Sequence, residues 1–326
     1  MNLGVIGGGA WGTALAQVAS TGGRETLLWA LEPEVVETIN AQHENSVYLP
    51  GIPLNGAIRA TSDLTELSAC DGWIVVTPAQ HMRSVLHGAP AGDRPLVLCS
   101  KGIEASSGKL LHEVAREVCP ASPIAVLSGP TFAHEVAAGL PTAVTLACED
   151  RELGEKLRSR INLVQFRTYC TDDVAGAEAG GAVKNVLAIA CGIVEGKRFG
   201  QNARAALIAR GFAEMTRFGV ALGGRRETLA GLSGLGDLVL TCSSTSSRNF
   251  SLGKAIGEGR EVGELMKDRR TVAEGAHTAP VVHRIAIERD IDMPIVGAVM
   301  ELLEGRTRID ELLQTLLSRP PRDEED

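Results

Sequence analysis

Residues 2–12 read Asn-Leu-Gly-Val-Ile-Gly-Gly-Gly-Ala-Trp-Gly, which places a glycine-rich turn directly after a short apolar strand. Gly7, Gly9 and Gly12 have the spacing G-x-G-x-x-G, and helix-forming residues follow from Thr13 to Ala19. In this context the first glycine permits a tight turn, the second admits a phosphate, and the third lets the helix pack against the strand. The helix N-terminus offers unpaired N–H groups to an anion. The stretch therefore predicts a dinucleotide site rather than a structural glycine-rich turn.

The composition limits which functions the chain can serve. Its 326 residues are enough for two domains, and 44% hydrophobic and 22% charged residues are typical of a soluble globular protein. A net charge of −8 argues against a nucleic acid partner. No uninterrupted apolar run approaches the ~20 residues of a membrane span, so no stable membrane insertion is expected. The seven cysteines form no C-x-x-C pair and the seven histidines lack ligand spacing, which favours a reducing cytoplasm and no metal site.

The pattern of hydrophobic residues changes near residue 175. Before it, continuous apolar runs alternate with helical patterns, which is typical of strands buried on both faces of a mostly parallel sheet. Strands are expected at 2–6, 26–30, 73–77, 95–99, 124–128, 142–147 and 165–170, and helices between them at 33–43, 79–88 and 108–118. Later segments have helical spacing only: 176–195, 203–222, 275–288, 295–304 and 309–317. We expect an α/β fold with an N-terminal Rossmann doubly wound domain (1–175), an all-helical C-terminal domain (176–318) and a disordered acidic tail (319–326).

Ligands of a doubly wound sheet bind beyond the carboxyl ends of its strands, and two of the expected strands end in suggestive residues. The strand at 95–99 runs into Lys101, which we expect to project into the crevice, although a solvated loop lysine fits equally well. The strand at 124–128 runs into Gly129-Pro130-Thr131, where glycine allows close approach of a ligand and proline can open a helix. An ordinary turn from strand to helix is the alternative there.

Lys184 lies in an apolar helical stretch, Gly180-Gly-Ala-Val-Lys-Asn185, that carries little other charge. A lysine in such a place must reach water, find a carboxylate or lose its proton. Two glycines within a helix cost roughly 1 kcal/mol each against alanine, so Gly180 and Gly181 indicate close approach of another backbone or of a ligand. A lysine that simply extends to solvent is the alternative.

Asp237 is a lone carboxylate among the leucines of residues 231–241. Because a buried carboxylate needs a partner, Asp237 and Lys184 are natural partners. A lysine oriented by a carboxylate can serve acid–base chemistry on a carbonyl group. A structural ion pair or a helix cap explains the pattern equally well.

The hydroxyl-rich segment 241–249 ends in Ser247-Arg248-Asn249 before an expected helix at 250–258. Hydroxyls, a guanidinium, an amide and a helix N-terminus are the parts of a phosphate site. A flexible serine-rich linker is the alternative. Val272 and Glu274 precede another expected helix, where they also fit a capping element.

Taken together, six motifs closely resemble the bacterial NAD(P)-dependent glycerol-3-phosphate dehydrogenases. They are Gly7-x-Gly-x-x-Gly12, Ser-Gly-Pro-Thr-Phe-Ala at 128–133, Gly-Gly-Ala-Val-Lys-Asn at 180–185, Gly-Leu-Gly-Asp-Leu-Val-Leu-Thr-Cys at 234–242, Ser-Arg-Asn at 247–249 and Val-x-Glu-Gly at 272–275. The resemblance implies reversible reduction of dihydroxyacetone phosphate to sn-glycerol 3-phosphate with NADH or NADPH, which supplies phospholipid synthesis. It also implies a Rossmann domain followed by a helical domain, in a cytoplasmic enzyme that is often a homodimer.

The resemblance further assigns roles to individual residues. Lys184 matches the proton donor and acceptor at the substrate C2 oxygen, Lys101 matches a cation that contacts substrate and cofactor, and Asp237 accompanies Lys184. The implied substrate-binding residues are Lys101, Gly129, Thr131, Lys184, Asp237, Ser247, Arg248 and Asn249. The implied cofactor-binding residues are Gly7, Gly9, Ala10, Trp11, Gly12, Leu31, Lys101, Ala133, Arg248, Val272 and Glu274.

Two positions depart from the family pattern. Family members usually carry serine at Ala10, and often arginine or histidine at Leu31, where a cation would meet the 2′-phosphate of NADP. Here Glu32 follows, twenty residues past Gly12, where an acidic residue would bind the ribose of NAD. We therefore predict that NADH is used at least as well as NADPH.

Two other classes of protein share several of these features. A dehydrogenase of 3-hydroxy acids would have the same Rossmann start and helical domain, although the Arg248 segment and the Asp237 motif argue against it. A regulator that binds NAD(H) without turnover would not need Lys184 and Asp237 in apolar helices. Oxidation of NADH on addition of dihydroxyacetone phosphate distinguishes these alternatives.

Overall fold

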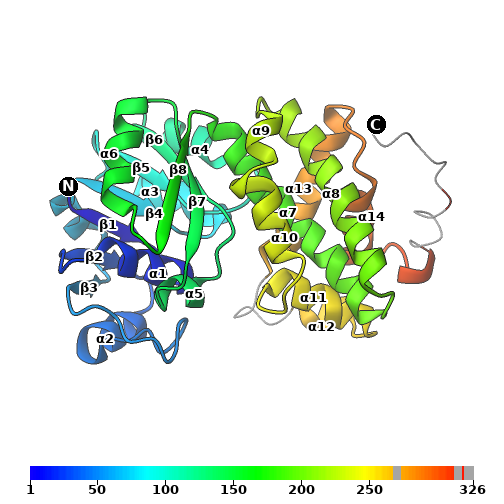
Figure 1. Ribbon diagram of the computed structural model, residues 1–326, viewed down its shortest axis with the longest axis horizontal. Coiled ribbons are helices and arrows are strands. Elements are labelled where there is room, and N and C mark those ends of the chain that lie inside the picture. The colour runs from blue at the N-terminus through cyan, green and yellow to red at the C-terminus, as the bar shows by residue number, and fades with distance from the viewer. Residues whose placement is uncertain (267–272, 312–317, 319–326) are drawn as a thin grey trace.

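The computed structural model describes residues 1–266, 273–311 and 318, and it places a sheet-containing half beside a helical half (Figure 1). The sheet has the strand order β3-β2-β1-β4-β5-β6-β7-β8. Neighbouring strands are parallel except β6 and β7, which confirms the mostly parallel doubly wound sheet. The strands are β1 (Leu3–Ile6), β2 (Thr26–Trp29), β3 (Ile58–Thr61), β4 (Gly72–Val75), β5 (Leu96–Leu98), β6 (Ile124–Ser128), β7 (Thr142–Cys148) and β8 (Phe166–Thr171).

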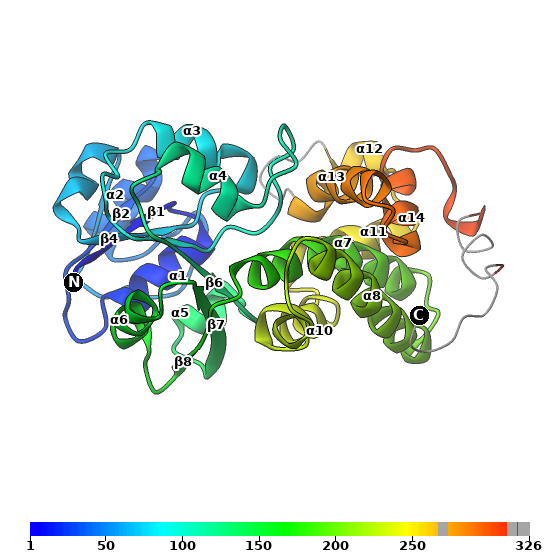
Figure 2. The same cartoon turned by 90° about the horizontal axis from the view of Figure 1, so that it is seen from above.

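Helices cover both faces of this sheet (Figure 2). They are α1 (Ala10–Ala19), α2 (Pro33–Gln42), α3 (Met82–His87), α4 (Leu111–Val118), α5 (Ala133–Ala137) and α6 (Arg151–Ile161), with 3-10 turns η1 (Leu64–Ala69) and η2 (Ala79–His81). Successive strand residues point to opposite faces. Val5 therefore packs in one core with α1, α2, α5 and α6, whereas Ile6 packs in a second core with α3 and α4.

The strand β3 and the helix α6 are not among the elements expected from the sequence. The strand β3 is only four residues long, and its exposed Arg59 interrupts the apolar run that marks the other strands. The helix α6 is rich in charged residues and buries only Gly154, Leu157 and Ile161. Weak apolar periodicity hides both elements from a reading based on hydrophobic runs.

The helical half is arranged around α7 (Val174–Gly196), in which every residue from 176 to 194 is buried. The other elements are α8 (Gln201–Ala221), α9 (Arg226–Leu229), the π-helical turn η3 (Leu232–Gly236), α10 (Asp237–Thr241), α11 (Arg248–Gly257), α12 (Val262–Leu265), α13 (Glu274–Glu288) and α14 (Pro294–Leu303). On length and composition α7 could cross a membrane, but its apolar surface is wholly buried in the protein. Most of the helix expected at 309–317, and the tail at 319–326, lie outside the described residues.

Glycines bring α11 unusually close to α7. A β-carbon at Gly192 would lie 2.1 Å from the carbonyl oxygen of Phe250, and one at Gly253 would lie 2.0 Å from the carbonyl oxygen of Ile189. Real β-carbons do not approach so closely, so only glycine fits at these two positions. This α7–α11 contact fixes the position of the N-terminus of α11, which carries Arg248, relative to α7, which carries Lys184.

Candidate active site

One buried carboxylate bridges two lysines from different halves of the molecule. Lys184 Nζ on α7 donates to Asp237 Oδ1 at 2.5 Å, and Lys101 Nζ, after β5, donates to Asp237 Oδ2 at 2.5 Å. Asp237 is fully buried, and the side chains of Lys184 and Lys101 are 6% and 15% exposed. Lys101 Nζ also lies 3.4 Å from the carbonyl oxygen of Gly129, which follows β6. The two lysines therefore meet at the carboxyl edge of the sheet, where doubly wound folds bind their ligands.

Local backbone structure explains how these groups come together. A β-carbon at Gly180 would lie 2.6 Å from the carbonyl oxygen of Ser233, so glycine allows the π-helical turn to press against α7. Asp237 is the first residue after that turn, and π-helical turns are frequent at functional sites. Gly181 faces the hydroxyl of Ser128 and the side chain of Lys101. Gly180 thus marks the expected close approach of another backbone, whereas Gly181 lies against side chains of the site.

Burial and neighbouring charges change the pKa of Lys184. Burial lowers the pKa of Lys184 from 10.5 to about 8, and the charge of Lys101 acts in the same direction. The charge of Asp237 opposes this change by favouring the protonated form. A lysine with this pKa can both give and accept a proton near neutral pH.

Thr241 is a further member of this centre. Its Oγ1 accepts a hydrogen bond from Lys184 Nζ at 2.9 Å and lies 3.3 Å from Asp237 Oδ1. No separate role for Thr241 is expected from the sequence, where it falls in the 231–241 segment, the 234–242 motif and the hydroxyl-rich segment. Its position four residues after Asp237, on the same face of a helix, is the signal that could have identified it.

The predicted phosphate residues lie at the N-terminus of α11. Ser247 caps this helix by accepting a hydrogen bond from Phe250 N at 3.2 Å, and Arg248 is its first residue. Asn249 Oδ1 accepts from Gly275 N at 2.9 Å, which ties α11 to the start of α13. Burial raises the pKa of Glu274, and the charges of Arg248, Lys101 and Lys184 oppose that rise. The charges of Arg248 and Glu274 therefore act on the same region as the group formed by Lys184, Lys101 and Asp237. This group is called the lysine centre below.

The glycine-rich turn has the shape that a dinucleotide pyrophosphate requires. Gly7 has φ +125°, a conformation that favours glycine, and a β-carbon at Gly12 would lie 1.8 Å from the Gly7 carbonyl oxygen. A β-carbon at Gly9, the N-cap of α1, would meet no atom of the described residues within 4 Å. The turn is thus tight on one side and open at the helix N-terminus, where an anion binds.

Buried polar atoms near strand ends support the same assignment. Within the described part of the chain, five buried side-chain polar atoms have no hydrogen-bond partner: Arg160 Nε, Thr168 Oγ1 and, at this edge of the sheet, Trp11 Nε1, Thr77 Oγ1 and Ser128 Oγ. Trp11 is the second residue of α1, within the glycine-rich motif, Thr77 follows β4, and Ser128 ends β6. Buried polar groups normally have partners, so these atoms indicate a polar ligand along the carboxyl edge. The residues present therefore fit a dinucleotide.

The remaining predicted residues are distributed along the same edge, with one exception. Gly129 accepts a hydrogen bond from Thr131 Oγ1 at 3.3 Å, and Ala133 is the first residue of α5. Ala10 is the first residue of α1. Leu31, two residues after β2, is 72% exposed. Val272 lies outside the described residues.

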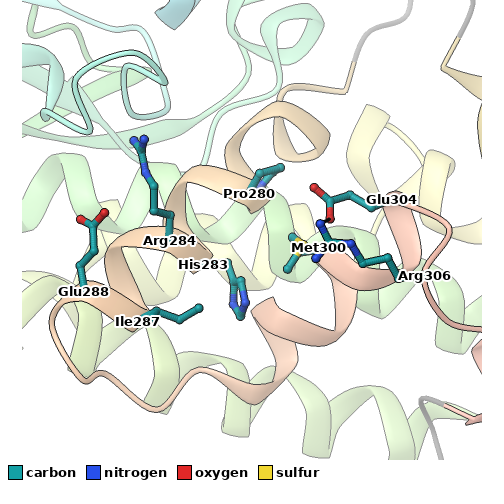
Figure 3. Close-up of a pocket in the computed structure, with 8 residues that line it drawn as sticks. All are labelled: Pro280, His283, Arg284, Ile287, Glu288, Met300, Glu304 and Arg306. Carbon is teal, nitrogen blue, oxygen red and sulfur yellow. Dashed lines mark ion pairs between the residues drawn. The ribbon is translucent and has the colours of Figure 1, made fainter.

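A surface pocket of ≈ 350 Å³ is lined by residues of α13 and of α14 with the turn after it (Figure 3). Its lining residues are Pro280, His283, Arg284, Ile287, Glu288, Met300, Glu304 and Arg306. Arg284 also donates to the carbonyl oxygen of Ala105 at 3.0 Å, in the loop that follows Lys101. The pocket contains none of the predicted site residues, so it has no part in the lysine centre.

The fold and the site together define a Rossmann-type, two-domain dehydrogenase of the nicotinamide-dependent class. Residues 2–154 match the family model described as NAD-dependent glycerol-3-phosphate dehydrogenase N-terminus, and residues 173–314 match the model of its C-terminus. The chain belongs to the NAD-dependent glycerol-3-phosphate dehydrogenase family.

Individual relatives agree with this membership. The chain is 62% identical over 322 residues to a glycerol-3-phosphate dehydrogenase [NAD(P)+] of Erythrobacter litoralis, covering 99% of this chain and 97% of the relative. It is also 62% identical over 319 residues to the Novosphingobium aromaticivorans protein of that name, covering 98% and 96%. The crystal structure of glycerol-3-phosphate dehydrogenase from Coxiella burnetii is 38% identical, covers 98% of this chain and 99% of that chain, and has a TM-score of 0.93.

Proposed function

We propose that this protein interconverts dihydroxyacetone phosphate and sn-glycerol 3-phosphate with NADH or NADPH, and so supplies glycerol 3-phosphate for phospholipid synthesis. Membership of the glycerol-3-phosphate dehydrogenase family supports the reaction. The observation that carries the proposal is the Asp237 carboxylate, which holds Lys184 and Lys101 together at the carboxyl edge of the sheet.

Substrate binding begins at the phosphate. Arg248 and the N-terminus of α11 together offer a guanidinium and a positive helix end to the dianion. The α7–α11 contact sets how far this phosphate lies from Lys184. Binding energy from the phosphate therefore orients the ketone against the lysine centre.

Proton transfer falls to Lys184. A reduced nicotinamide dinucleotide held at the glycine-rich turn of Gly7, Gly9 and Gly12 would supply the hydride for the substrate C2 carbon. As negative charge develops on the C2 oxygen, the ammonium groups of Lys184 and Lys101 stabilise it, and Lys184 delivers its proton to that oxygen. Asp237 also accepts a hydrogen bond from Lys101 Nζ at 2.5 Å, so it keeps a cationic partner after Lys184 has given up its proton. Lys184 accepts the proton again in the reverse reaction, so the same groups serve both directions.

A panel of ketones tests the proposed reaction. The purified protein is mixed with NADH, and separately with NADPH, and oxidation is followed after addition of dihydroxyacetone phosphate, of unphosphorylated dihydroxyacetone or of a 3-oxo acid. We expect rapid oxidation with dihydroxyacetone phosphate only. Preference for the 3-oxo acid would support the related 3-hydroxy acid dehydrogenase, and binding of NADH without oxidation by any ketone would support a non-catalytic regulator.

We extend the proposal to the assembly and location of the protein. The resemblance described above implies a cytoplasmic homodimer, and membership of a NAD-dependent dehydrogenase family supports a small-molecule substrate and a dinucleotide as its partners. Light scattering of the protein in solution measures the mass directly, and a mass of twice the 34.3 kDa chain is expected. A mass equal to one chain at working concentrations would contradict the dimer.

A further inference from the structure

A tyrosine contacts the acidic residue at the end of β2. Tyr48 Oη donates a hydrogen bond to Glu32 Oε1 at 2.9 Å, and Glu32 is the N-cap of α2. The end of β2 lies directly beside the glycine-rich turn, since Gly7 N donates to the carbonyl oxygen of Trp29 at 3.0 Å. Glu32 and Tyr48 therefore lie on the side of the phosphate cradle where a Rossmann fold receives the adenosine ribose.

Hydrogen bonds of Asn45 connect the segment that carries Tyr48 to the glycine-rich turn. Asn45 is fully buried, and its Nδ2 donates to the carbonyl oxygen of Gly8 and to Thr13 Oγ1, both at 2.8 Å. Asn45 Oδ1 in turn accepts from Tyr48 N at 3.0 Å. One buried amide thus couples the position of Tyr48 to the turn that would hold the pyrophosphate.

The charges around this pair are unsuited to a second phosphate. Residues 30–38 include three glutamates, Glu32, Glu34 and Glu37, and no cationic residue. Leu31, beside Glu32, is an exposed apolar side chain. Arg59 on the neighbouring strand β3 pairs with Glu66 at 2.7 Å. A 2′-phosphate would bring a second anion against the Glu32 carboxylate, whereas a 2′-hydroxyl can donate a hydrogen bond to it.

We propose that Tyr48 is a specificity-determining residue, which holds the Glu32 carboxylate so that it accepts the ribose hydroxyl of NAD(H) and repels the 2′-phosphate of NADP(H). A carboxylate has acceptor sites for several donors, so Glu32 can accept from Tyr48 and from the ribose at the same time. Tyr48 orients the Glu32 carboxylate, and the negative charge of Glu32 discriminates against the 2′-phosphate. The inference rests on the proposed function only in requiring that a dinucleotide binds at the glycine-rich turn.

Binding of the adenosine end alone provides the test, because it needs no catalysis. Isothermal titration calorimetry measures the Kd of ADP-ribose and of 2′-phospho-ADP-ribose for the wild type, Tyr48→Phe, Glu32→Gln and Tyr169→Phe. The control Tyr169 is the second of the chain's two tyrosines and is an exposed residue of β8. We expect the wild type to bind ADP-ribose at least about tenfold more tightly than its 2′-phosphate, given one charged hydrogen bond gained and one repulsion avoided.

The variants show whether Tyr48 acts by orienting the Glu32 carboxylate or only by stabilising the fold. Tyr48→Phe should weaken ADP-ribose roughly three- to tenfold while changing 2′-phospho-ADP-ribose less than about twofold. Glu32→Gln should reduce the preference by strengthening the 2′-phosphate form, and Tyr169→Phe should change neither ligand. Equal wild-type affinities, or equal weakening of both ligands by Tyr48→Phe, would overturn this inference alone. If neither ligand bound the wild type, the proposed function would be overturned with it.

Discussion

Lys184 Nζ lies 2.5 Å from Asp237 Oδ1 inside the helical half, and the two residues are 5% and 0% exposed. Buried ion pairs of this kind often add less stability than apolar residues of the same volume would. Here the pair also has Lys101 as a third member, so one carboxylate serves two ammonium groups. The centre therefore carries excess positive charge where a ketone oxygen becomes negative, which explains the arrangement better than stability does.

Replacing Asp237 by asparagine should move the pH profile of the reduction. Lys184 must be protonated to act as an acid, and burial lowers its pKa to about 8 while Asp237 opposes that effect. In the wild type, kcat/KM for dihydroxyacetone phosphate should therefore fall as pH rises above about 8, and in Asp237→Asn the decline should begin at lower pH. The profile measured for both proteins checks this. A lower rate with the same pH dependence would show that Asp237 does not tune Lys184.

The assignment of Arg248 predicts a loss of phosphate recognition. In Arg248→Ala, the KM for dihydroxyacetone phosphate should rise about 10- to 100-fold, since charged hydrogen bonds contribute roughly 1.5–3 kcal/mol. At saturating NADH, the slow reduction of unphosphorylated dihydroxyacetone should change much less, because that ketone has no phosphate for the guanidinium to bind. Steady-state kinetics with both ketones give the comparison. An unaltered KM for the phosphate ester would remove Arg248 from this role.

The α7–α11 contact predicts that adding one methyl group at Gly192 displaces the N-terminus of α11, where the substrate phosphate is proposed to bind. Gly192→Ala would force its β-carbon against the carbonyl oxygen of Phe250, so the free energy of unfolding should fall by about 1–3 kcal/mol and KM for dihydroxyacetone phosphate should rise. Gly263→Ala is the control, because a β-carbon there meets no atom of the described residues within 4 Å. Urea denaturation and kinetics of both variants provide the readout. Equal stability of the two variants would contradict the close approach.

Glu214 predicts a pH dependence of stability. Its carboxylate accepts hydrogen bonds from Ile295 N at 2.7 Å and Val296 N at 3.1 Å, yet burial raises its pKa from 4.5 to about 7. The pKa of Glu214 is therefore higher in the folded protein than in the unfolded chain. Protonated Glu214 contributes to the free energy of unfolding below pH 4.5, and this contribution is lost as pH rises through about 7.

The variant Glu214→Gln isolates this effect. Relative to the variant, the wild type should lose roughly 3 kcal/mol of unfolding free energy between pH 4.5 and pH 8. Denaturant titrations of the two proteins across this range measure the difference. A constant difference between them would show that Glu214 does not titrate in the folded protein.

The sequence predicts the Rossmann half well because its strands are continuous apolar runs. β1, β4 and β6 stand out in this way, and the glycine turn after β1 identifies the ligand edge. β3 is missed because Arg59 breaks its short pattern. Helix positions are likewise predictable where one face is apolar, whereas the charged α6 is not.

The site was only partly predictable. Lys184 and Asp237 could be identified because a charge in an apolar segment needs a partner. Arg248 was indicated by its place before an expected helix, and Lys101 by its place after an expected strand. Only resemblance indicated Trp11 and Val272. Distances between separate elements cannot be read from local pattern, so the sequence gives no sign that Asp237 contacts both lysines. The π-helical turn before Asp237, and the hydrogen bond of Tyr48 to Glu32, depend in the same way on how distant segments pack.

The most direct test of the account is the turnover of Lys184→Ala measured beside its binding of NADH. The variant should reduce dihydroxyacetone phosphate with kcat lowered about 10²- to 10⁴-fold, because the proton donor is lost, while the Kd of NADH stays within about twofold of the wild type. Lys254→Ala, which removes a partly exposed lysine of α11 paired with Glu258, should keep normal turnover. Near-normal kcat in Lys184→Ala would contradict the proposed role of the lysine–aspartate centre.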